Sequence, residues 1–283
     1  MRLRGSHRTA LKQQWQRLAV RLSKAEIDMT GNRRQFLRTT VGSTVAAAMS
    51  SELLNAQRQV STRSHIRAVA FDALVIFDMG TVAKRADEEF PGKGLVLTKL
   101  WRLRQFEYTW LRTAGERYRD FWHIAEDALK YACAAMKLQL SAAQRDSLMK
   151  AYHELRPWPD VLKALTEFKR QKIRMAFLTN FTVDMIIRNL AGTELSGFFE
   201  DHLTTDRVGA FKPSPRAYQM ALDYFGYQRH EIAFVAFAPW DVAGAKWFGY
   251  PTFWINRAGV SPEELDVLPD FMGHSLSGTE MFF

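Results

Sequence analysis

One stretch of this chain constrains its fold more than any other, the run RAVAFDALVIFD at residues 67–78. Apolar, β-favouring residues lead to a single carboxylate, Asp72, and a second apolar run then leads to Asp78. This pattern is typical of a buried strand that carries one acid at its carboxyl end. In open α/β sheets ligands bind in the crevice beyond such strand ends, so Asp72 is a candidate functional residue. The alternative is that Asp72 only caps a helix or a turn.

The second half of the chain predicts a parallel sheet. From residue 158 onward, helical segments alternate with short apolar segments that carry almost no charge, as in sheets with helices on both faces. Strands are expected at 175–179, 202–204, 232–237 and 252–255, and helices at 158–170, 183–190, from Ser214-Pro215, at 243–248 and from the capping pattern Ser261-Pro262-Glu263-Glu264. The fold class is therefore α/β.

A long helical block rich in aromatic residues lies between the first strand and this series. Residues 95–152 have the apolar spacing of helices with a few breaks, and Ser141 with Gln144 forms a capping box. Residues 80–94 contain glycine and proline and are expected to be irregular. The pattern predicts a helical lid inserted into the α/β core.

The positive charge of the chain is confined to its leader. The whole chain has a net charge of +9, but residues 1–64 contain 12 Lys or Arg against 3 Asp or Glu, and the rest of the chain holds 27 of each. The part that is expected to fold is neutral. A basic face for nucleic acid is therefore not indicated.

Within the leader, Arg33 and Arg34 precede a short uncharged run of small residues at 39–51. This arrangement resembles a twin-arginine export signal, and the run is too short to anchor the chain in a bilayer. Met29 is a candidate for the true start. Signal cleavage is left open between Ala46, Ala48 and Ala56. The leader predicts a periplasmic protein that meets the twin-arginine export machinery; a basic tail with a chance arginine pair would leave the protein in the cytoplasm.

Polar groups are expected at or just after the ends of four separate strands. Because the carboxyl ends of parallel strands meet at one edge of a sheet, these groups should converge there. Each of these polar groups, taken alone, could instead have a purely structural role, such as that of a loop lysine or a helix N-cap. They are Asp72, Thr179 with Asn180, Lys212, and Trp240 with Asp241.

These positions resemble the haloacid dehalogenase superfamily and, more closely, its (S)-2-haloacid dehalogenase branch, over about residues 66–270. The stretches that carry the resemblance are AFDALVIFD (70–78), LWRLRQFEYTWLR (100–112), RYRDFW (117–122), FLTN (177–180), FKPSPRAY (211–218) and PWDVAGAKWFGYPTFWINR (239–257). With the leader predicted at 1–64, the resemblance implies a Rossmann-like core at 65–80 and 156–283, a helical cap at 81–155, and a homodimer.

The resemblance also implies a reaction, the hydrolytic dehalogenation of short (S)-2-haloalkanoic acids to 2-hydroxy acids. Asp72 would displace the halide and form an ester with inversion, while Lys212 would orient and charge-balance it. Arg102 on the cap would bind the substrate carboxylate or receive the halide, and Asp241 would hold or activate the water that hydrolyses the ester. The implied substrate-binding residues are Leu74, Phe106, Phe121, Thr179, Asn180, Tyr218 and Trp240.

No metal and no cofactor are expected. Phosphatase members of the superfamily place a second acid two residues after the nucleophile, where it helps to hold Mg²⁺. Here that position is Leu74, and the loop after the fourth strand offers only Asp241. Asp78 is interpreted as structural. A magnesium-dependent phosphatase is the least favoured alternative.

The chain departs from the branch at positions that bond the nucleophile, the halide or the water. The usual Asp-x-Tyr-Gly-Thr is replaced by Asp-Ala-Leu-Val-Ile at 72–76, and Ser-Ser-Asn-x-Trp-Asp by Ala-Phe-Ala-Pro-Trp-Asp at 236–241. Leu103 stands where a lid glutamine is expected, and Thr179 stands in for a serine. Two hypotheses stay open. One is a working or weakened dehalogenase with a reshaped apolar pocket; the other is a catalytically lapsed member that binds a small carboxylate or a protein partner.

Overall fold

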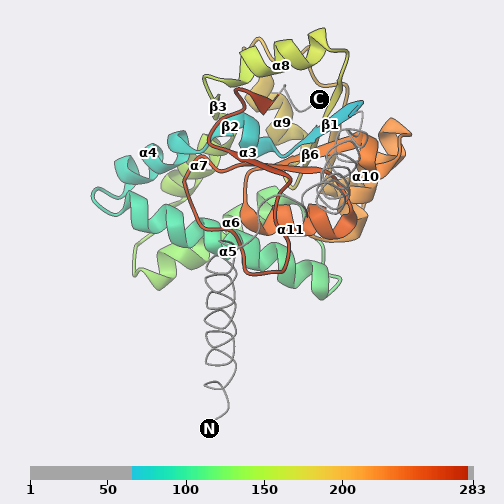
Figure 1. Cartoon of the computed structure of the whole chain (residues 1–283). Helices are drawn as coiled ribbons and strands as arrows, with labels where there is room; N and C mark the ends of the chain where they lie inside the picture. Colours follow the sequence, from blue (N-terminus) through green and yellow to red (C-terminus); the bar gives the residue numbers. More distant parts are fainter. Residues whose placement is uncertain (1–65, 280–283) are drawn as a thin grey trace, which may run out of the picture. The chain divides into compact units, whose positions relative to one another are not determined.

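The computed structural model describes residues 66–279, and a six-stranded sheet lies at their centre (Figure 1). The strand order is β5-β4-β1-β6-β7-β8, and every neighbouring pair is parallel. The strands are β1 (Ala68–Phe71), β4 (Arg174–Thr179), β5 (His202–Thr204), β6 (Ile232–Ala236), β7 (Thr252–Ile255) and β8 (Phe271–Gly273). The predicted α/β class with a parallel sheet is confirmed.

The order of the strands places a ligand crevice beside β1. The chain adds β4 and β5 on one side of β1 and then returns to add β6 and β7 on the other side. In sheets of this type the crevice opens where the strand order reverses, at the carboxyl ends of the two strands that flank the reversal. Those strands are β1 and β6, which precede Asp72 and Asp241.

Helices cover both faces of the sheet because successive side chains of a strand point to opposite faces. Val69 and Phe71 of β1 belong to one apolar cluster, together with residues of α8 and α9. Ala68 and Ala70 belong to a second cluster, with residues of α10 and α11. The helices are α8 (Val161–Arg170), α9 (Val183–Leu190), α10 (Pro215–Phe225) and α11 (Pro239–Phe248). Burial on both sides explains why β1 contains no polar residue.

The helical block at residues 80–153 forms a cap, whose helices Figure 1 shows gathered beside the sheet. They are α4 (Gly80–Glu89), α5 (Gly94–Ala114), α6 (Phe121–Ala135) and α7 (Ala142–Lys150), followed by the 3₁₀ turn η1 (Ala151–His153). The indole N–H of Trp101 on α5 donates to the carbonyl of Ala125 on α6 at 2.7 Å. The predicted capping box of Ser141 and Gln144 is confirmed.

A two-stranded antiparallel ribbon connects the cap to the core. It consists of β2 (Phe77–Asp78), where the chain leaves the core, and β3 (Arg156–Pro157), where it returns. Asp78 Oδ1 accepts a hydrogen bond from the backbone N–H of Gly80 at 2.9 Å, where α4 begins. This ribbon lies at the predicted borders of the cap.

Two local predictions were wrong. Residues 80–89, expected to be irregular, form α4, because Val82 and Ala86 lie one turn apart and are both buried. The charged residues around them and the glycines that follow hid this short apolar stripe. The helix expected after Ser261 is absent, since residues 261–270 contain no helix or strand. The capping pattern there is followed by exposed leucines, so it had no apolar face to bury.

Residues 1–65 and 280–283 lie outside the described part of the structure, and the predicted leader with its arginine pair falls there. Between residues 66 and 279, no helix combines the length and the apolar character needed to cross a membrane.

Candidate active site

Asp72 occupies the first position after the central strand β1. It is the N-cap of the short helix α3 (Ala73–Ile76), and its Oδ1 accepts a hydrogen bond from the backbone N–H of Leu74 at 2.8 Å. Its Oδ2 lies 2.7 Å from Nζ of Lys212. The structural interpretation of Asp72 as a helix cap therefore accounts for one carboxylate oxygen, and the other oxygen takes part in a buried ionic site.

Lys212 lies at the centre of that site. Its side chain is fully buried, and Nζ donates to Asp72 Oδ2 and, at 2.5 Å, to Asp241 Oδ2. Burial acts to lower the pKa of Lys212, but the two carboxylates outweigh burial and raise the pKa above its ordinary value. The ammonium group therefore stays charged and joins the ends of β1 and β6.

Asp241 belongs to the first turn of α11 and is buried. Its Oδ1 accepts a hydrogen bond from the hydroxyl of Tyr218 on α10 at 2.6 Å. Burial raises the pKa of Asp241 to about 6, with Lys212 opposing this shift and Asp72 adding to it. Burial and the neighbouring Asp241 carboxylate raise the pKa of Tyr218 well above its ordinary value, so Tyr218 remains a hydrogen-bond donor.

Thr179 and Asn180, at the end of β4, support the lysine loop. Asn180 Oδ1 accepts a hydrogen bond from the backbone N–H of Lys212 at 3.1 Å. The hydroxyl of Thr179 accepts one from the backbone N–H of Phe181 at 3.1 Å and so holds the turn that carries Asn180. Both side chains are buried. The residues predicted at the four strand ends thus come together at one edge of the sheet.

The close fit of α11 against α10 depends on Gly244. A Cβ atom at this position would overlap the hydroxyl oxygen of Tyr218 and lie 2.6 Å from Cβ of Pro213. We expect Gly244→Ala to lower the free energy of unfolding by about 1–3 kcal/mol, because overpacking forces the neighbours apart. It should also displace Tyr218 from Asp241.

Urea denaturation measures this effect, and Gly197→Ala is the matched control because a Cβ at Gly197 meets no atom within 4 Å. An unchanged stability of Gly244→Ala would contradict the tight packing of Tyr218.

Arg102, on α5 of the cap, lines a cavity of about 590 Å³ next to this site. The cavity wall also includes Leu74, Phe106 and Trp240. The rings of Phe106 and Trp240 pack with their centres 5.2 Å apart. The Arg102 guanidinium lies 5.5 Å from the centre of the Phe237 ring, and among residues 66–279 no carboxylate forms an ion pair with it. The cavity therefore offers an unpaired positive charge in apolar surroundings.

The wall of this cavity does not include the three charged residues of the buried site, Asp72, Asp241 and Lys212. Two wall residues lie close to the acids in the chain: Leu74, whose N–H donates to Asp72 two positions earlier, and Trp240, which directly precedes Asp241. The Asp72 side chain is 10% exposed, whereas Asp241 and Lys212 are closed to solvent. Asp72 is thus the member of the ionic group most open to a ligand.

Two residues predicted to bind substrate lie elsewhere. Tyr218 is fully buried behind Asp241. Phe121 packs against Phe181 and Phe211, with ring centres 5.4 and 6.4 Å apart, and does not line the cavity. Both therefore support the site from behind. Their sequence positions show which segment carries them but not the direction of the side chain.

Sequence reasoning missed the role of Arg257, which follows β7. Its guanidinium pairs with both oxygens of Asp160 at 3.0 Å and donates to the carbonyl of Val75 at 3.2 Å. Arg257 thereby holds the α3 turn that follows Asp72. The WINR ending contained this residue, but only the fold brings it beside the first strand.

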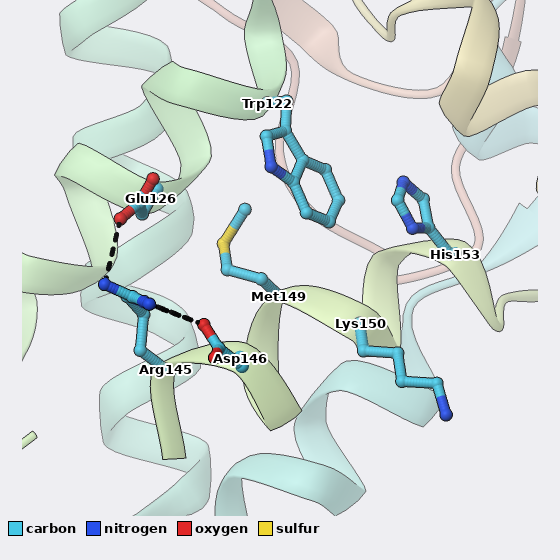
Figure 2. Close-up of a pocket in the computed structure, with 7 residues that line it drawn as sticks. All are labelled: Trp122, Glu126, Arg145, Asp146, Met149, Lys150 and His153. Carbon is cyan, nitrogen blue, oxygen red and sulfur yellow. Dashed lines mark hydrogen bonds and ion pairs between the residues drawn. The ribbon is translucent and has the colours of Figure 1, made fainter. Parts of the chain in front are cut away.

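A second hollow, of about 360 Å³, lies between α6 and α7 of the cap (Figure 2). Its charges are largely paired, since Arg145 contacts Glu126 at 3.7 Å and Asp146 at 2.7 Å. Trp122 and His153 stack with ring centres 4.2 Å apart. We place the functional site at the Arg102 cavity, because its wall carries Arg102 and residues close in the chain to the buried acids.

Asp72 lies where the strand order of the parallel sheet reverses, and a helical cap is inserted after the first strand. These two features together define a class of capped α/β enzymes. A family model described as haloacid dehalogenase-like hydrolase matches residues 21–249, and the chain belongs to this family. It is therefore a hydrolase of this family, as the resemblance implied.

Relatives support the narrower branch as well. The chain is 39% identical over 220 residues to the (S)-2-haloacid dehalogenase of Pseudomonas sp. (strain YL), which covers 77% of this chain and 95% of that protein. Among solved structures, the L-2-haloacid dehalogenase RSc1362 is 40% identical with a TM-score of 0.75, over 77% of this chain and 98% of that one.

A third match is the L-2-haloacid dehalogenase from Xanthobacter autotrophicus with chloropropionic acid covalently bound. It is 29% identical with a TM-score of 0.70, over 76% of this chain and 97% of that one. The predicted resemblance to the (S)-2-haloacid dehalogenase branch is confirmed.

Proposed function

We propose that this protein hydrolyses short (S)-2-haloalkanoic acids to 2-hydroxy acids through an ester on Asp72. The main support for the proposal is the buried group of charges where the strand order reverses. There Lys212 Nζ lies 2.7 Å from Asp72 and 2.5 Å from Asp241. It supplies a nucleophilic carboxylate whose charge is balanced by an ammonium. The covalently bound chloropropionic acid named for the Xanthobacter structure agrees with an intermediate of this kind.

The first step is a displacement at carbon. An Asp72 oxygen forms a bond to C2 of the substrate while the carbon–halogen bond breaks, and the electron pair leaves with the halide. The configuration at C2 inverts. Arg102 binds the substrate carboxylate or receives the halide, and the apolar wall with Leu74 and Phe106 keeps water from the attacking oxygen.

The second step is hydrolysis of the ester. Water adds to the carbonyl carbon of the Asp72 ester, the bond from that carbon to the 2-hydroxy acid oxygen breaks, and the Asp72 carboxylate is restored. Asp241 takes one proton of the attacking water and gives it to the departing 2-hydroxy acid oxygen, and the second proton of the water passes to solvent when the Asp72 carboxylate re-forms. Tyr218 holds Asp241 in place, and Lys212 balances the negative charge that develops.

Asp241 gives this step a pH dependence with a definite sign. A base must be ionised to accept a proton, and burial raises the pKa of Asp241 to about 6. We expect the rate of ester hydrolysis to be constant above this pH and to fall about tenfold per pH unit well below the pKa that Asp241 has in the ester, where Asp72 is uncharged and no longer raises that pKa. Stopped-flow decay of a preformed ester at several pH values measures this step, and a decay rate that stays constant down to pH 4 would rule out Asp241 as the base.

A catalytically lapsed protein is the second candidate, and the surroundings of Asp72 favour it. Among residues 66–279, the hydrogen bonds to the Asp72 carboxylate come from Leu74 N and Lys212 Nζ. Val75 and Ile76 are buried apolar residues where the branch usually has glycine and threonine. In this alternative the Arg102 cavity would bind a small carboxylate, or the protein a partner, without turnover.

Halide release from a panel of short (S)-2-halo acids, beginning with 2-chloropropanoate, separates the two candidates. The dehalogenase releases halide and forms the (R)-2-hydroxy acid; the lapsed protein releases none but binds the unhalogenated acid. Each assay is run with added Mg²⁺ and with EDTA, since activity that requires Mg²⁺ would favour a phosphatase. The prediction of a metal-independent, cofactor-free reaction is tested in the same way.

We also propose that the protein is exported to the periplasm by the twin-arginine machinery. The support is Arg33-Arg34 before the uncharged run at 39–51. Replacing both arginines by lysine should keep the protein in the cytoplasm of a cell that has this machinery, and fractionation measures the change. Equal distribution of both forms would contradict export. The homodimer stays a prediction from the resemblance, and light scattering tests it.

A further inference from the structure

The Arg102 side chain, which the proposed reaction places at the substrate anion, lies over an aromatic ring of the core. Its Cζ atom is 5.5 Å from the centre of the Phe237 ring, and with residues 66–279 its guanidinium makes no hydrogen bond and no ion pair. A cation within about 6 Å of an aromatic ring centre is attracted by the negative face of the ring. Phe237 is therefore a group that can hold the Arg102 side chain in place.

Phe237 is itself fixed by the core. It directly follows β6, and its carbonyl accepts a hydrogen bond from the indole N–H of Trp254 on β7 at 3.2 Å. Its half-buried ring packs against the apolar cluster that contains Val69 and Phe71, and it also lines the Arg102 cavity. The ring thus offers a fixed surface on the core to a long, flexible side chain on the cap.

The same side of α5 makes a second contact with the loop after β6. Arg102, Phe106 and Trp110 follow one another at intervals of four residues, so they lie on one side of the helix. The rings of Phe106 and Trp110 pack against Trp240, with centres 5.2 and 5.7 Å apart. The contact of Arg102 with Phe237 is therefore part of a larger contact that joins the cap to the core beside the cavity.

The residue at position 237 is one of the departures from the (S)-2-haloacid dehalogenase branch. Phe237 stands where the branch usually has the second serine of Ser-Ser-Asn-x-Trp-Asp, and Ala236 and Ala238 replace the polar residues on either side of it. The usual motif places a small hydroxyl group at this position. The aromatic ring under Arg102 is therefore a feature of this chain that the usual motif does not supply.

A neutral ring suits the position of Arg102 better than a carboxylate would. A carboxylate paired with Arg102 would neutralise the charge that the substrate anion needs, whereas the ring attracts the guanidinium and leaves its charge available. The apolar wall of the cavity strengthens this attraction, because a cation–ring contact gains when water is excluded. A side chain that is held before the substrate binds also avoids the cost of ordering it at that moment.

We propose that Phe237 is a positioning residue for Arg102. Its ring holds the guanidinium at the place in the cavity where the substrate carboxylate or the departing halide binds. Phe237 acts on the reaction through Arg102 and not by contact with the reacting atoms. This inference rests on the proposed dehalogenation and adds a residue to its site.

Fluorinated phenylalanines at position 237 test the proposal, because each fluorine weakens the negative face of the ring with little change in its size. Full-length protein is prepared with one, two or three fluorines on this ring. We expect kcat/KM for (S)-2-chloropropanoate to fall steadily along the series, by about three- to tenfold overall. A kcat/KM that stays level overturns the proposal, because a ring that only fills space would act equally well at each step.

Phe198 is the matched control position. Its ring is also half-buried and lies 5.2 Å from a cation, Nζ of Lys169, but it does not line the cavity. The same fluorinated series at Phe198 should leave kcat/KM unchanged. An equal fall at both positions would show that the loss at Phe237 is a general effect of weakening such a contact, and would overturn its role in positioning Arg102.

Phe237→Leu extends the test to an ordinary substitution. It removes the ring and should lower kcat/KM about three- to thirtyfold. A loss confined to KM indicates that the positioned guanidinium binds the substrate carboxylate, whereas a loss in kcat indicates that it receives the halide. A Phe237→Leu protein with the kinetic constants of wild type contradicts the proposal.

Calorimetric titration with unhalogenated propanoate and with bromide separates failure of this proposal from failure of the dehalogenation. Halide release that does not depend on the ring fluorines overturns the role of Phe237 and leaves the dehalogenation standing. If no halo acid reacts but propanoate or bromide binds, with an affinity that falls along the fluorinated series, Phe237 positions Arg102 and the dehalogenation fails. If no halo acid reacts and the fluorines change neither affinity, both are overturned.

Discussion

Replacing Asp72 by asparagine is expected to reduce halide release by a factor on the order of 10⁴ or more, the size of loss that removal of a catalytic nucleophile produces. The neutral amide oxygen of asparagine lacks the charge of a carboxylate and is a poor nucleophile. The fold should persist, because asparagine is as good a helix N-cap as aspartate and can still accept from the N–H of Leu74.

The charges of the site also predict that the fold of Asp72→Asn persists. Asp72, Asp241 and Lys212 together carry one excess negative charge, so Asp72→Asn leaves a neutral pair of Lys212 and Asp241. No buried charge loses its only partner, and we expect the free energy of unfolding to change by no more than about 1 kcal/mol. The loss of activity should therefore be separable from any loss of structure.

Three measurements check this prediction: halide release, urea denaturation, and the intact mass of the protein after incubation with substrate. Wild type should gain the mass of the acid without its halogen, and Asp72→Asn should gain none.

Asp87→Asn is the control, since Asp87 also accepts backbone hydrogen bonds, from Gly92 and Gly94, but lies away from the cavity wall. Persistent turnover would remove Asp72 as nucleophile, and an unfolded variant would make its role structural.

The sequence predicted well what depends on local pattern and on strand order. The helix at 183–190 and the strand at 202–204 have the predicted bounds. Asp72, Asn180, Lys212 and Asp241 meet because parallel strands end at one edge of the sheet, and this follows from alternation of helix and strand alone.

The sequence could not predict what depends on the direction of side chains or on distant pairing. Phe121 and Tyr218 belong to matching segments, yet they point away from the cavity and support the residues in front of them. Arg257 reaches Val75 across the sheet, from 182 positions away in the chain. The extent of the cavity along α5 depends on how cap and core meet, and no local periodicity records that.

Replacing Lys212 by methionine is expected to lower the free energy of unfolding at neutral pH by about 3–5 kcal/mol, the effect of removing one partner from a buried ion group. Methionine keeps most of the volume of lysine but leaves Asp72 and Asp241 without a counter-charge in a site closed to solvent. Lys246→Met is the matched control. Lys246 is partly exposed and pairs with Asp270 at 2.8 Å, and its loss should lower stability by about 1 kcal/mol or less.

The pH dependence of this variant has a predictable sign. Burial already raises the pKa of Asp241 in the wild type to about 6, and loss of the Lys212 charge removes an influence that lowers it. A carboxyl group whose pKa is higher in the folded than in the unfolded state binds protons preferentially when folded. The deficit in the free energy of unfolding of Lys212→Met relative to wild type should therefore shrink as the pH falls from 7 towards 4.

Adding Asp241→Asn to Lys212→Met removes one of the two uncompensated charges and should recover part of the lost stability at pH 7. It should also flatten the pH dependence, because the group that takes up the proton is gone. Urea denaturation of the four proteins between pH 4 and pH 8 measures both effects. If Lys212→Met is no less stable than Lys246→Met at pH 7, or if its deficit grows as the pH falls, the ammonium of Lys212 does not balance the two acids, and the proposed charge arrangement around the nucleophile is wrong.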